Sequence, residues 1–549
     1  AQEGEKPVLQ LNTVNAEQDA YVRNILIPTN NLEGDALPVS AFLPYVTGKV
    51  PSGTAAFEKR GIAVDIPVWH AENCTQCNWC STVCPHAVIR PFILKPEDAQ
   101  GLTTVDCKSA PGKRFLIAVS AEDYTGCGSC AEMCPAHGKA LFMERAAGRM
   151  HDDQETFEYA KKVGVQQGSG KNVKEAQFLR PYLEYSGACP GCGETPYAKM
   201  VTQLFGDHAI IANATGCSSI WGASVPSMPY VVDEKGRGPA WANSLFEDNA
   251  EFGYGMSVSM RTRREGIKTV VERLAKNPAF GGIANAWLKN RNTAEANHLG
   301  ESLVELCKVY PENEDAQFVV KNADLLPRPS TWIFGGDGWA YDIGYGGVDH
   351  VLASGENINI LVLDTEVYSN TGGQASKATN TGAVAQFAAA GKAVQKKDLA
   401  AIAMQYGNVY VAQVAMGADY SQTLRALLEA ESYPGTSIII AYAPCISHGI
   451  KIGMNNTMLE MKAAVQAGYW HLFRYDPRRK EKGRNPFQLD SPAPIMDYQE
   501  FLTGEVRYSS LQLTFPERAT ELFARAEKEA QEKYARLVEL SKPWEAKDA

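Results

Sequence analysis

The sequence lacks the features of a membrane-spanning protein and of a nucleic-acid-binding protein. It contains no run of about 18 apolar residues, which a membrane-spanning helix would need, and no signal peptide opens the chain. The net charge is -10, and no basic patch with interleaved aromatic side chains occurs. We therefore expect neither a membrane nor nucleic acid among the partners of this chain.

The composition is that of an ordinary globular protein except for its cysteines. Of the 549 residues, 45% are hydrophobic and 21% are charged, which is enough material for two or three domains. The 13 cysteines cluster in Cys-x2-Cys steps, which fits metal binding in a reducing cytoplasm better than a disulfide scaffold. The chain begins Ala-Gln-Glu-Gly without methionine, which we interpret as a processed start or a piece of a longer polypeptide.

The first four cysteines have the spacing that holds a bacterial 4Fe-4S cluster. They form the run Cys74-x2-Cys77-x2-Cys80-x3-Cys84, which is followed by Pro85. Thiolates are soft ligands that select iron-sulfur clusters or zinc, and this tight run favours a cluster. The sequence therefore predicts that the protein transfers electrons.

A second run repeats the latter half of the first, as in a two-cluster ferredoxin with internal pseudo-symmetry. It reads Cys127-x2-Cys130-x3-Cys134 and is again followed by proline. In that fold the last cysteine of each run crosses to the other cluster. The first ligand set is therefore predicted to be Cys74, Cys77, Cys80 and Cys134, and the second set to begin with Cys84, Cys127 and Cys130.

The second ligand set lacks one cysteine. The regular spacing requires it at position 124, where the chain has Tyr124, and a phenol is a poor replacement for a thiolate. The nearest remaining thiol is Cys107, and the Gly and Pro residues of segment 108–113 could fold it inward. We expect Cys107 to be the fourth ligand. The alternative is that Cys107 is a buried free cysteine and that the second cluster is a degenerate three-iron cluster.

The chain is predicted to have four segments. Residues 1–65 form a small connecting segment, 66–150 the ferredoxin-like domain, and 151–180 a linker. Residues 181–549 form one larger domain, interrupted by charged helical sequence at about 245–325.

The larger domain has the alternating pattern of an α/β protein. Short β-rich apolar runs bounded by Gly, Asp or Pro alternate with helical patterns, which indicates a mostly parallel sheet covered on both faces. The predicted strands are residues 208–214, 330–335, 358–364, 408–416 and 436–444. We therefore predict an α/β, mostly parallel sheet domain, preceded by a small α+β two-cluster ferredoxin-like domain.

A third group of cysteines lies at the predicted ends of strands in the larger domain. Cys189 and Cys192 open that domain, while Cys217 and Cys445 each follow a predicted strand. Zinc held by four thiolates would explain such a group. Since two upstream clusters would then lead nowhere, we favour a third 4Fe-4S cluster.

Two strand ends carry a pattern that suits a diphosphate with its cation. Gly336-Asp337-Gly338 follows one strand, and its glycines allow phosphate oxygens close to the backbone. Thr365 and the carbonyl of Val367 follow the next strand. Together with the Asp337 carboxylate they could complete a magnesium shell, because Mg²⁺ keeps few protein ligands and several waters.

These patterns together resemble a known family. Gly336-Asp337-Gly338 and Thr365-x-Val367-x2-Asn370 resemble the thiamine-diphosphate signature. With the three cysteine groups and the element Glu58-Lys59-Arg60, the chain resembles the carboxyl-terminal half of pyruvate:ferredoxin oxidoreductase, in its single-chain form.

The resemblance implies a set of site residues. Asp337, Thr365 and Val367 would bind Mg²⁺, and Asn370 would donate a hydrogen bond to the substrate carbonyl or the developing oxyanion; its alternative role is to cap the loop. Glu194 would lie by the cofactor, and Cys189, Cys192, Cys217 and Cys445 would hold the cluster nearest to it. The residues that would line thiamine diphosphate are Gly336, Asp337, Gly338, Trp339, Thr365, Glu366, Val367, Tyr368, Ser369 and Asn370.

The resemblance also implies an activity and partners. The expected reaction is oxidative decarboxylation of pyruvate to acetyl-CoA and CO2, with thiamine diphosphate as the electron sink. Electrons would pass through three 4Fe-4S clusters to ferredoxin or flavodoxin. The pyrimidine-binding half of the active site would lie upstream or on a partner chain, and the assembly would form a dimer, so the chain alone should bind iron without decarboxylating pyruvate.

Two alternatives remain. Oxalate, 2-oxoglutarate or a branched 2-oxo acid could replace pyruvate, because the discriminating residues are expected on the other half. A polyferredoxin with a vestigial α/β domain would bind no thiamine diphosphate.

Overall fold

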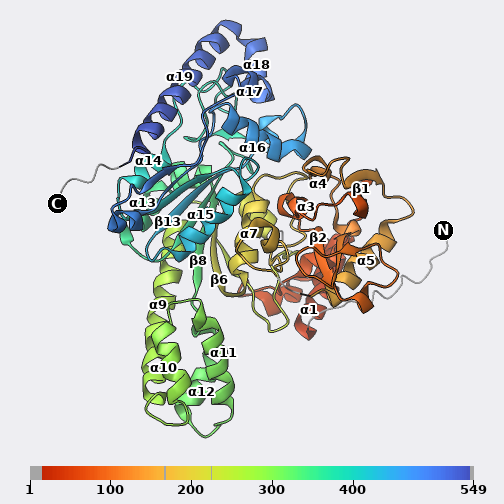
Figure 1. The fold of residues 1–549 in the computed structure, drawn as a ribbon, viewed down its shortest axis with the longest axis vertical. Helices are drawn as coiled ribbons and strands as arrows, with labels where there is room; N and C mark the ends of the chain where they lie inside the picture. The colour runs from red at the N-terminus through yellow and green to blue at the C-terminus, as the bar shows by residue number, and fades with distance from the viewer. Residues whose placement is uncertain (1–14, 166–167, 224–225, 544–549) are drawn as a thin grey trace. The chain divides into compact units, whose positions relative to one another are not determined.

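The computed structural model describes residues 15–165, 168–223 and 226–543, and the chain divides into two compact units (Figure 1). The first unit comprises Ala1–Leu204, Ser219–Gly236 and Ile452–Glu460, and the second comprises Phe205–Ser218, Arg237–Lys451 and Met461–Ala549.

The first unit is a small α+β structure. Its strands form a three-stranded antiparallel sheet in the order β2-β4-β3 and a two-stranded antiparallel ribbon, β1-β5. The strands are β1 (Asp65–Trp69), β2 (Ile89–Leu94), β3 (Val105–Asp106), β4 (Arg114–Val119) and β5 (Leu141–Arg145). Helix α5 (Met150–Val163) packs on the larger sheet, where Phe157 meets Phe92 edge to face at 5.6 Å between ring centroids.

The two cysteine runs of this unit share one local backbone. Each begins with a one-turn 3₁₀ helix, η5 (Ala71–Asn73) or η7 (Ala121–Asp123), and ends in a short helix, α3 (Trp79–Val83) or α4 (Ser129–Glu132). The residue before each short helix is left-handed, which a glycine or asparagine adopts most readily. The predicted ferredoxin-like repeat is confirmed.

The second unit is built on an eight-stranded sheet in the order β15-β14-β12-β13-β9-β8-β6-β7. From β12 to β7 every neighbouring pair is parallel, and β14 and β15 add an antiparallel edge. The strands are β6 (Ala209–Ala214), β7 (Ala240–Ser244), β8 (Ser330–Gly336), β9 (Asn359–Asp364), β12 (Tyr410–Val414), β13 (Ser437–Tyr442), β14 (Phe473–Tyr475) and β15 (Phe487–Leu489). The predicted α/β class is confirmed, and all five predicted strands form.

Helices cover this sheet, as the crossovers between parallel strands require. Residues of β6, β8, β9, β12 and β13 are buried throughout or nearly so, which is why these strands read as continuous apolar runs. The helices are α13 (Tyr345–Ser354), α14 (Leu399–Met404), α15 (Tyr420–Ser432), α17 (Tyr498–Thr503), α18 (Val506–Thr514) and α19 (Pro516–Leu540).

The predicted helical insertion is a helical arm of the second unit (Figure 1). It consists of α9 (Asn249–Leu274), α10 (Gly281–Asn290), α11 (Glu295–Lys308) and α12 (Glu314–Lys321). The arm has its own apolar core, in which Trp287, Leu303 and Cys307 are fully buried. Cys307 is therefore a packing residue.

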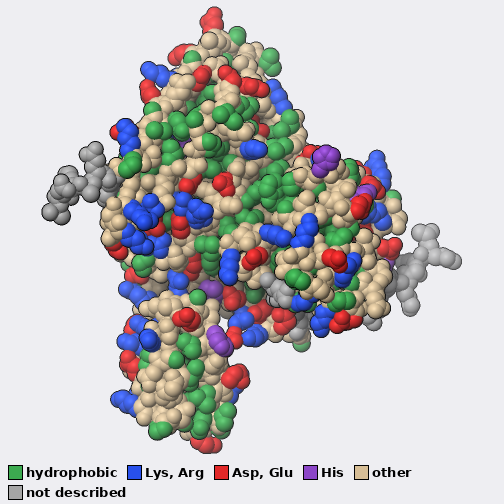
Figure 2. All heavy atoms as spheres, viewed as in Figure 1, with side chains coloured by type: hydrophobic (Ala, Val, Ile, Leu, Met, Phe, Trp, Pro, Cys, Tyr) green, Lys and Arg blue, Asp and Glu red, His purple; other side chains and the backbone are tan. Residues whose placement is uncertain are grey.

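The described part of the surface shown in Figure 2 has no large basic patch, in line with the sequence. Basic and acidic side chains are interspersed on the face shown in Figure 2. Among the helices described, none is both long enough and apolar enough to cross a bilayer.

Candidate functional site

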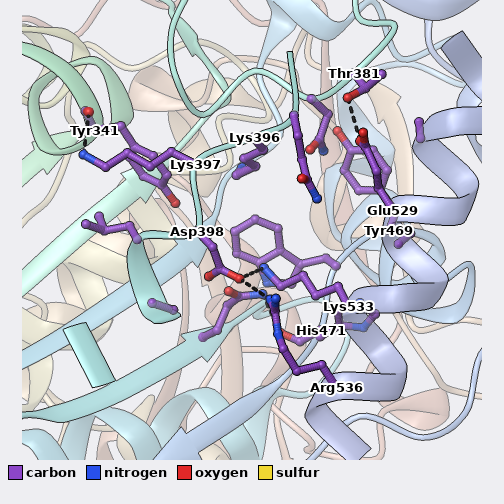
Figure 3. A pocket seen from close by; sticks show the side chains of 18 of the residues that line it. Tyr341, Thr381, Lys396, Lys397, Asp398, Tyr469, His471, Glu529, Lys533 and Arg536 are labelled. Atoms are coloured by element: carbon purple, nitrogen blue, oxygen red, sulfur yellow. Dashed lines mark hydrogen bonds and ion pairs between the residues drawn. The ribbon is translucent and has the colours of Figure 1, made fainter. Parts of the chain in front are cut away.

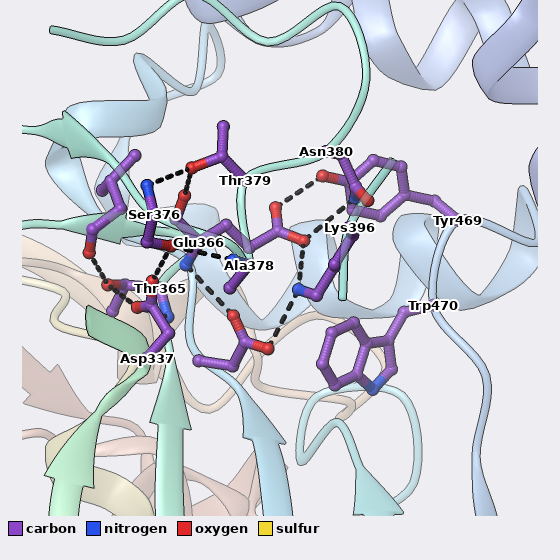
Figure 4. A network of polar contacts seen from close by, with 12 residues as sticks. Asp337, Thr365, Glu366, Ser376, Ala378, Thr379, Asn380, Lys396, Tyr469 and Trp470 are labelled. Atoms are coloured by element: carbon purple, nitrogen blue, oxygen red, sulfur yellow. Dashed lines mark hydrogen bonds and ion pairs between the residues drawn. The ribbon is translucent and has the colours of Figure 1, made fainter. Parts of the chain in front are cut away.

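The three predicted magnesium ligands meet at the carboxyl edge of the large sheet. Thr365 Oγ1 lies 3.0 Å from Asp337 Oδ1 and 3.0 Å from the Val367 carbonyl oxygen, and the Thr365 backbone N–H donates to Asp337 Oδ1 at 3.1 Å (Figure 4). Strands β8 and β9 are parallel neighbours, so the residues that follow them share one edge. Three hard oxygen atoms on adjacent loops are a donor set that suits Mg²⁺.

The Asp337 carboxylate is fully buried and held from both sides. Its second oxygen accepts a hydrogen bond from Ser376 Oγ at 2.5 Å. Burial, and then the nearby Asp364 carboxylate, raise the pKa of Asp337 well above its ordinary value. A divalent cation would offset this cost, because it favours the ionised form of a carboxylate beside it.

Two of the glycines beside Asp337 have no room for a side chain. A Cβ at Gly338 would lie 2.5 Å from the Tyr368 ring, and a Cβ at Gly335 would lie 2.3 Å from the Trp339 ring. Glycine is therefore required at both positions for packing, whereas a Cβ at Gly336 would meet only an ordinary contact, 3.8 Å from the Leu363 carbonyl. The glycines thus let the loop after β8 pack against aromatic rings.

A buried ionic network supports the loop after β9 (Figure 4). Lys396 Nζ lies 2.9 Å from both Asp364 Oδ2 and Glu366 Oε1, and Arg507 lies 2.8 Å from Glu366 Oε2. Burial alone would raise the pKa of Glu366, but the Lys396 and Arg507 cations lower it to about 2. Glu366 has a left-handed backbone (φ 62°), a strained state that such a network can hold in place.

The remaining residues of this loop lie toward solvent. Asn370 is exposed on the turn after Tyr368, and Ser369 Oγ lies 3.3 Å from the Cys217 sulfur. Cys217 follows β6 and Cys445 follows β13, and both strands are parallel to β8 and β9. We call the predicted magnesium ligands Asp337, Thr365 and Val367 the oxygen cluster. Within the second unit, this cluster therefore lies at the same edge of the sheet as Cys217 and Cys445.

The other two cysteines of the third group belong to the first unit. Cys189 is exposed and Cys192 is partly buried, immediately before helix α7 (Thr195–Phe205). The backbone N–H of Glu194 points at the Cys192 sulfur at 3.4 Å, and the Trp221 indole N–H donates to Glu194 Oε2 at 2.7 Å. Burial raises the pKa of Glu194 to about 7, against the lowering effect of that indole.

The first predicted ligand set surrounds one cavity in the first unit. Its four cysteines, Cys74, Cys77, Cys80 and Cys134, line this cavity. Trp69, Ile117 and Leu141 complete its apolar wall, and the Ala140 N–H points at the Cys134 sulfur at 3.2 Å. Burial raises the pKa of Cys80 well above its ordinary value, so metal binding there must displace a tightly held proton.

No group of three or more His, Cys, Asp or Glu side chains in the described segments closes around the position of a single metal ion.

The second predicted set is only partly assembled. Cys84, Cys127 and Cys130 lie close together: burial raises the pKa of the Cys130 thiol, and the other two thiols add to the shift. Cys107 stays a predicted fourth ligand, and the structure places it beside the first run. Its sulfur lies 3.3 Å from Ser109 Oγ, and both neighbours, Asp106 and Lys108, bind the side chain of Gln76 in the first run.

Sequence reasoning missed the residues that come from the irregular segment after β9. Ser376 and Lys396 reach the site from a stretch without a periodic pattern. His448, in the short 3₁₀ helix that follows β13, lies with its Nε2 2.7 Å from the Thr365 carbonyl oxygen. No local motif marks these positions, because their contacts span more than 25 residues.

A cavity of about 250 Å³ lies beside this network and was not predicted (Figure 3). Lys396 and Tyr341 line it on one side and helix α19 on the other. One carboxylate of its wall is paired with two cations: Asp398 lies 3.2 Å from Lys533 and 2.9 Å from Arg536. Lys396 joins the cavity to the ionic network of Asp364 and Glu366, and none of the predicted magnesium ligands lines it.

Comparisons with known proteins agree with this geometry. Family models match residues 318–441 (thiamine pyrophosphate enzyme, C-terminal TPP binding domain), residues 67–90 (4Fe-4S binding domain) and residues 10–63 (EKR, a domain of unknown function). The chain is 52% identical over 544 residues to the pyruvate:ferredoxin oxidoreductase of Moorella thermoacetica. The chain is homologous to pyruvate:ferredoxin oxidoreductases. The predicted resemblance and the predicted classes of cofactor, thiamine diphosphate and 4Fe-4S clusters, are confirmed.

Further relatives extend the homology. The pyruvate-flavodoxin oxidoreductase of Klebsiella pneumoniae is 51% identical over 95% of the chain, and the mitochondrial pyruvate dehydrogenase [NADP(+)] of Euglena gracilis is 46% identical over 91%. The chain spans only 46%, 45% and 28% of the Moorella, Klebsiella and Euglena proteins, respectively. A solved 2-oxoglutarate:ferredoxin oxidoreductase from Magnetococcus marinus covers 48% of this chain, and the chain 65% of it, at 16% identity and a TM-score of 0.28, too low to support an argument.

Proposed function

We propose that this chain is the diphosphate-binding and electron-transferring part of an enzyme that oxidatively decarboxylates pyruvate to acetyl-CoA and CO2. The observation that carries the proposal is the meeting of Asp337, Thr365 and Val367 oxygens at one sheet edge. The same chain carries four cysteines around one cavity. Homology over 95% of the chain supports pyruvate as the substrate.

Bound thiamine diphosphate would supply the electron sink that decarboxylation of a 2-oxo acid needs. The chain's own residues would position it. Asp337, Thr365 Oγ1 and the Val367 carbonyl would hold the Mg²⁺ ion that binds the diphosphate, and Ser376 would orient Asp337. Asn370, which is exposed at the end of this loop, would donate a hydrogen bond to the substrate oxygen as negative charge develops.

Electrons would leave through iron-sulfur clusters to ferredoxin or flavodoxin. The proximity of Cys217 to Ser369 in the cofactor loop supports a cluster near the reaction. The third ligand set, Cys189, Cys192, Cys217 and Cys445, stays a prediction from the sequence, with zinc as the alternative. The first set would hold a further 4Fe-4S cluster. The dimeric assembly and the cytoplasmic location also stay predictions.

The proposal includes a missing half of the active site. The chain spans less than half the length of the relatives it matches, and the pyrimidine-binding part would be supplied by other polypeptide. We expect the iron-loaded chain to bind Mg²⁺ and thiamine diphosphate weakly or moderately by itself and to need the complementary part for turnover.

The test is an anaerobic assay of the iron-loaded chain with Mg²⁺, thiamine diphosphate, pyruvate and coenzyme A, with a low-potential dye as electron acceptor. The chain alone should be inactive, and addition of the complementary part of a relative should produce acetyl-CoA and reduced dye. Turnover by the chain alone would refute the half-site. Turnover of the complete assembly with oxalate or 2-oxoglutarate, but not with pyruvate, would change the substrate.

A polyferredoxin without catalysis is the other candidate. It predicts no binding of thiamine diphosphate in calorimetry, with or without Mg²⁺. The buried Asp337 and its two hydroxyl partners, Thr365 and Ser376, favour the enzyme.

A further inference from the structure

The second ferredoxin-like site has Tyr124 where the first has Cys74. Both residues end a 3₁₀ turn that starts at an alanine: Cys74 N–H donates to the Ala71 carbonyl at 3.2 Å, and Tyr124 N–H donates to the Ala121 carbonyl at 3.3 Å. Their backbones agree, with φ -74° and ψ 121° for Cys74 and φ -76° and ψ 135° for Tyr124. By this internal repeat, Tyr124 stands at the place of the absent cysteine.

The Tyr124 side chain points toward the ligand thiols. Its ring is buried, with 1% of the residue exposed. The Gly128 backbone N–H donates to its hydroxyl oxygen at 3.0 Å, and that oxygen lies 3.6 Å from the Cys130 sulfur and 3.8 Å from the Met143 sulfur. The phenol is therefore fixed inside the second site.

This contact does not fit a terminal iron ligand. Terminal ligands on two irons of a cubane point outward from different corners, so they lie much farther apart than a hydrogen bond allows. The Tyr124 hydroxyl instead lies at hydrogen-bond distance from Cys130, itself an expected ligand. A phenol oxygen is also a hard donor, whereas these clusters are held by soft thiolates.

The thiol expected to replace it is engaged elsewhere. Cys107 sits in the turn before β4, where its N–H donates to the Lys113 carbonyl at 3.0 Å. Gln76, in the loop between Cys74 and Cys77, binds the residues on both sides of Cys107 at 2.7 and 2.9 Å. These contacts fix Cys107 beside the first run.

We propose that the second site is a three-thiolate site, made by Cys84, Cys127 and Cys130, that holds a three-iron cluster. Such a cluster is a cubane without one corner iron and needs three terminal thiolates. The Tyr124 phenol fills the open corner and donates a hydrogen bond to Cys130. Hydrogen bonds to the sulfurs are one of the levers on cluster potential, so the second site would differ from the first in its potential.

The test uses the anaerobically purified full chain and does not depend on its activity. After mild oxidation, an oxidised three-iron cluster is paramagnetic, whereas an oxidised 4Fe-4S cluster of the ferredoxin type is not. We expect a three-iron signal of about one spin per chain that persists after incubation with ferrous iron, sulfide and thiol. Mössbauer spectroscopy of the same unaltered protein should show this cluster beside four-iron clusters.

Three variants complete the test. Tyr124→Cys should abolish the three-iron signal and add one iron per chain, while Tyr124→Phe and Cys107→Ser should keep the signal. A silent oxidised spectrum of the unaltered chain would overturn the proposal. Appearance of the signal only in Tyr124→Phe would make Tyr124 a ligand, and its appearance only in Cys107→Ser would make Cys107 the ligand; both results contradict a three-thiolate site. If Tyr124→Cys fails to fold, the spectra of the unaltered chain still decide.

Discussion

The two units place their predicted metal ligands in different surroundings. In the first unit three of the predicted ligand cysteines are part of the core: Cys80, Cys84 and Cys130 are buried among Ile89, Phe115 and their neighbours. In the second unit the oxygen cluster lies at the edge of a sheet whose strands bury their own apolar side chains. This difference predicts that folding is coupled to metal binding in the first unit and is independent of it in the second.

Removal of iron is the strongest way to test this difference. Chelation under reducing conditions should destabilise the first unit by several kcal/mol, because its core is completed by the clusters. Hydrogen exchange should then show that β2 and β4 lose most of their protection while β8 and β9 keep theirs. Equal loss of protection in both units would contradict separable folding.

Asp337→Asn should separate cofactor binding from folding in the second unit. The asparagine oxygen can still accept from Thr365 and its amide nitrogen can donate to Ser376 Oγ, but the side chain carries no charge for Mg²⁺. Calorimetry should show at least about 100-fold weaker binding of Mg²⁺ and thiamine diphosphate. Loss of a residue that only supports a metal ligand costs up to about 100-fold, and loss of a ligand itself should cost at least as much. The iron content should not change, and Asp342→Asn, a nearby half-buried carboxylate, serves as the control.

Lys59→Met tests whether the segment before the clusters supports the second site. Lys59 Nζ lies 2.5 Å from Asp123 Oδ2, and only 4% of the Asp123 side chain is exposed, directly before Tyr124. Loss of the cation leaves a buried charge unpaired and should cost about 3 kcal/mol. Urea unfolding followed by cluster absorbance measures this cost. Arg60→Met is the matched control, because Arg60 is half exposed and pairs with Glu58; an equal effect in both variants would argue against a specific role for Lys59.

His471 should give the second unit a pH-dependent stability. Burial lowers the pKa of His471 to about 3 in the folded chain, whereas the ordinary pKa of about 6.5 applies in the unfolded chain. Below pH 6.5 the unfolded chain therefore binds a proton that the folded chain does not. The stability contributed by neutral His471 is therefore present above pH 6.5 and is lost as the pH falls toward 3, by up to about 1.4 kcal/mol per pH unit. His471→Gln should reduce this slope in urea unfolding between pH 6.5 and 5. The exposed His350→Gln is the control, and equal slopes in the two variants would exclude the effect.

Much of the fold was predictable because its signals are local. The five predicted strands were recognised because a parallel strand buried on both faces is a continuous apolar run. The cysteine runs were recognised because most ligands of a ferredoxin-type cluster come from one short stretch of chain with fixed spacing. Asp337 and Thr365 were recognised because each directly follows a strand, and neighbouring parallel strands end at the same edge.

The sequence by itself determined which donor atoms the chain offers to metals. These are soft thiolates in the first unit and hard oxygens after β8 and β9. Only the tertiary structure decided which side chains complete those sites. Ser376 reaches Asp337 across 39 positions of the chain, Gln76 fixes Cys107 beside the first run, and Tyr124 turns its hydroxyl to Cys130. Such contacts depend on how distant loops pack against one another, and no periodicity or spacing along the chain encodes that packing.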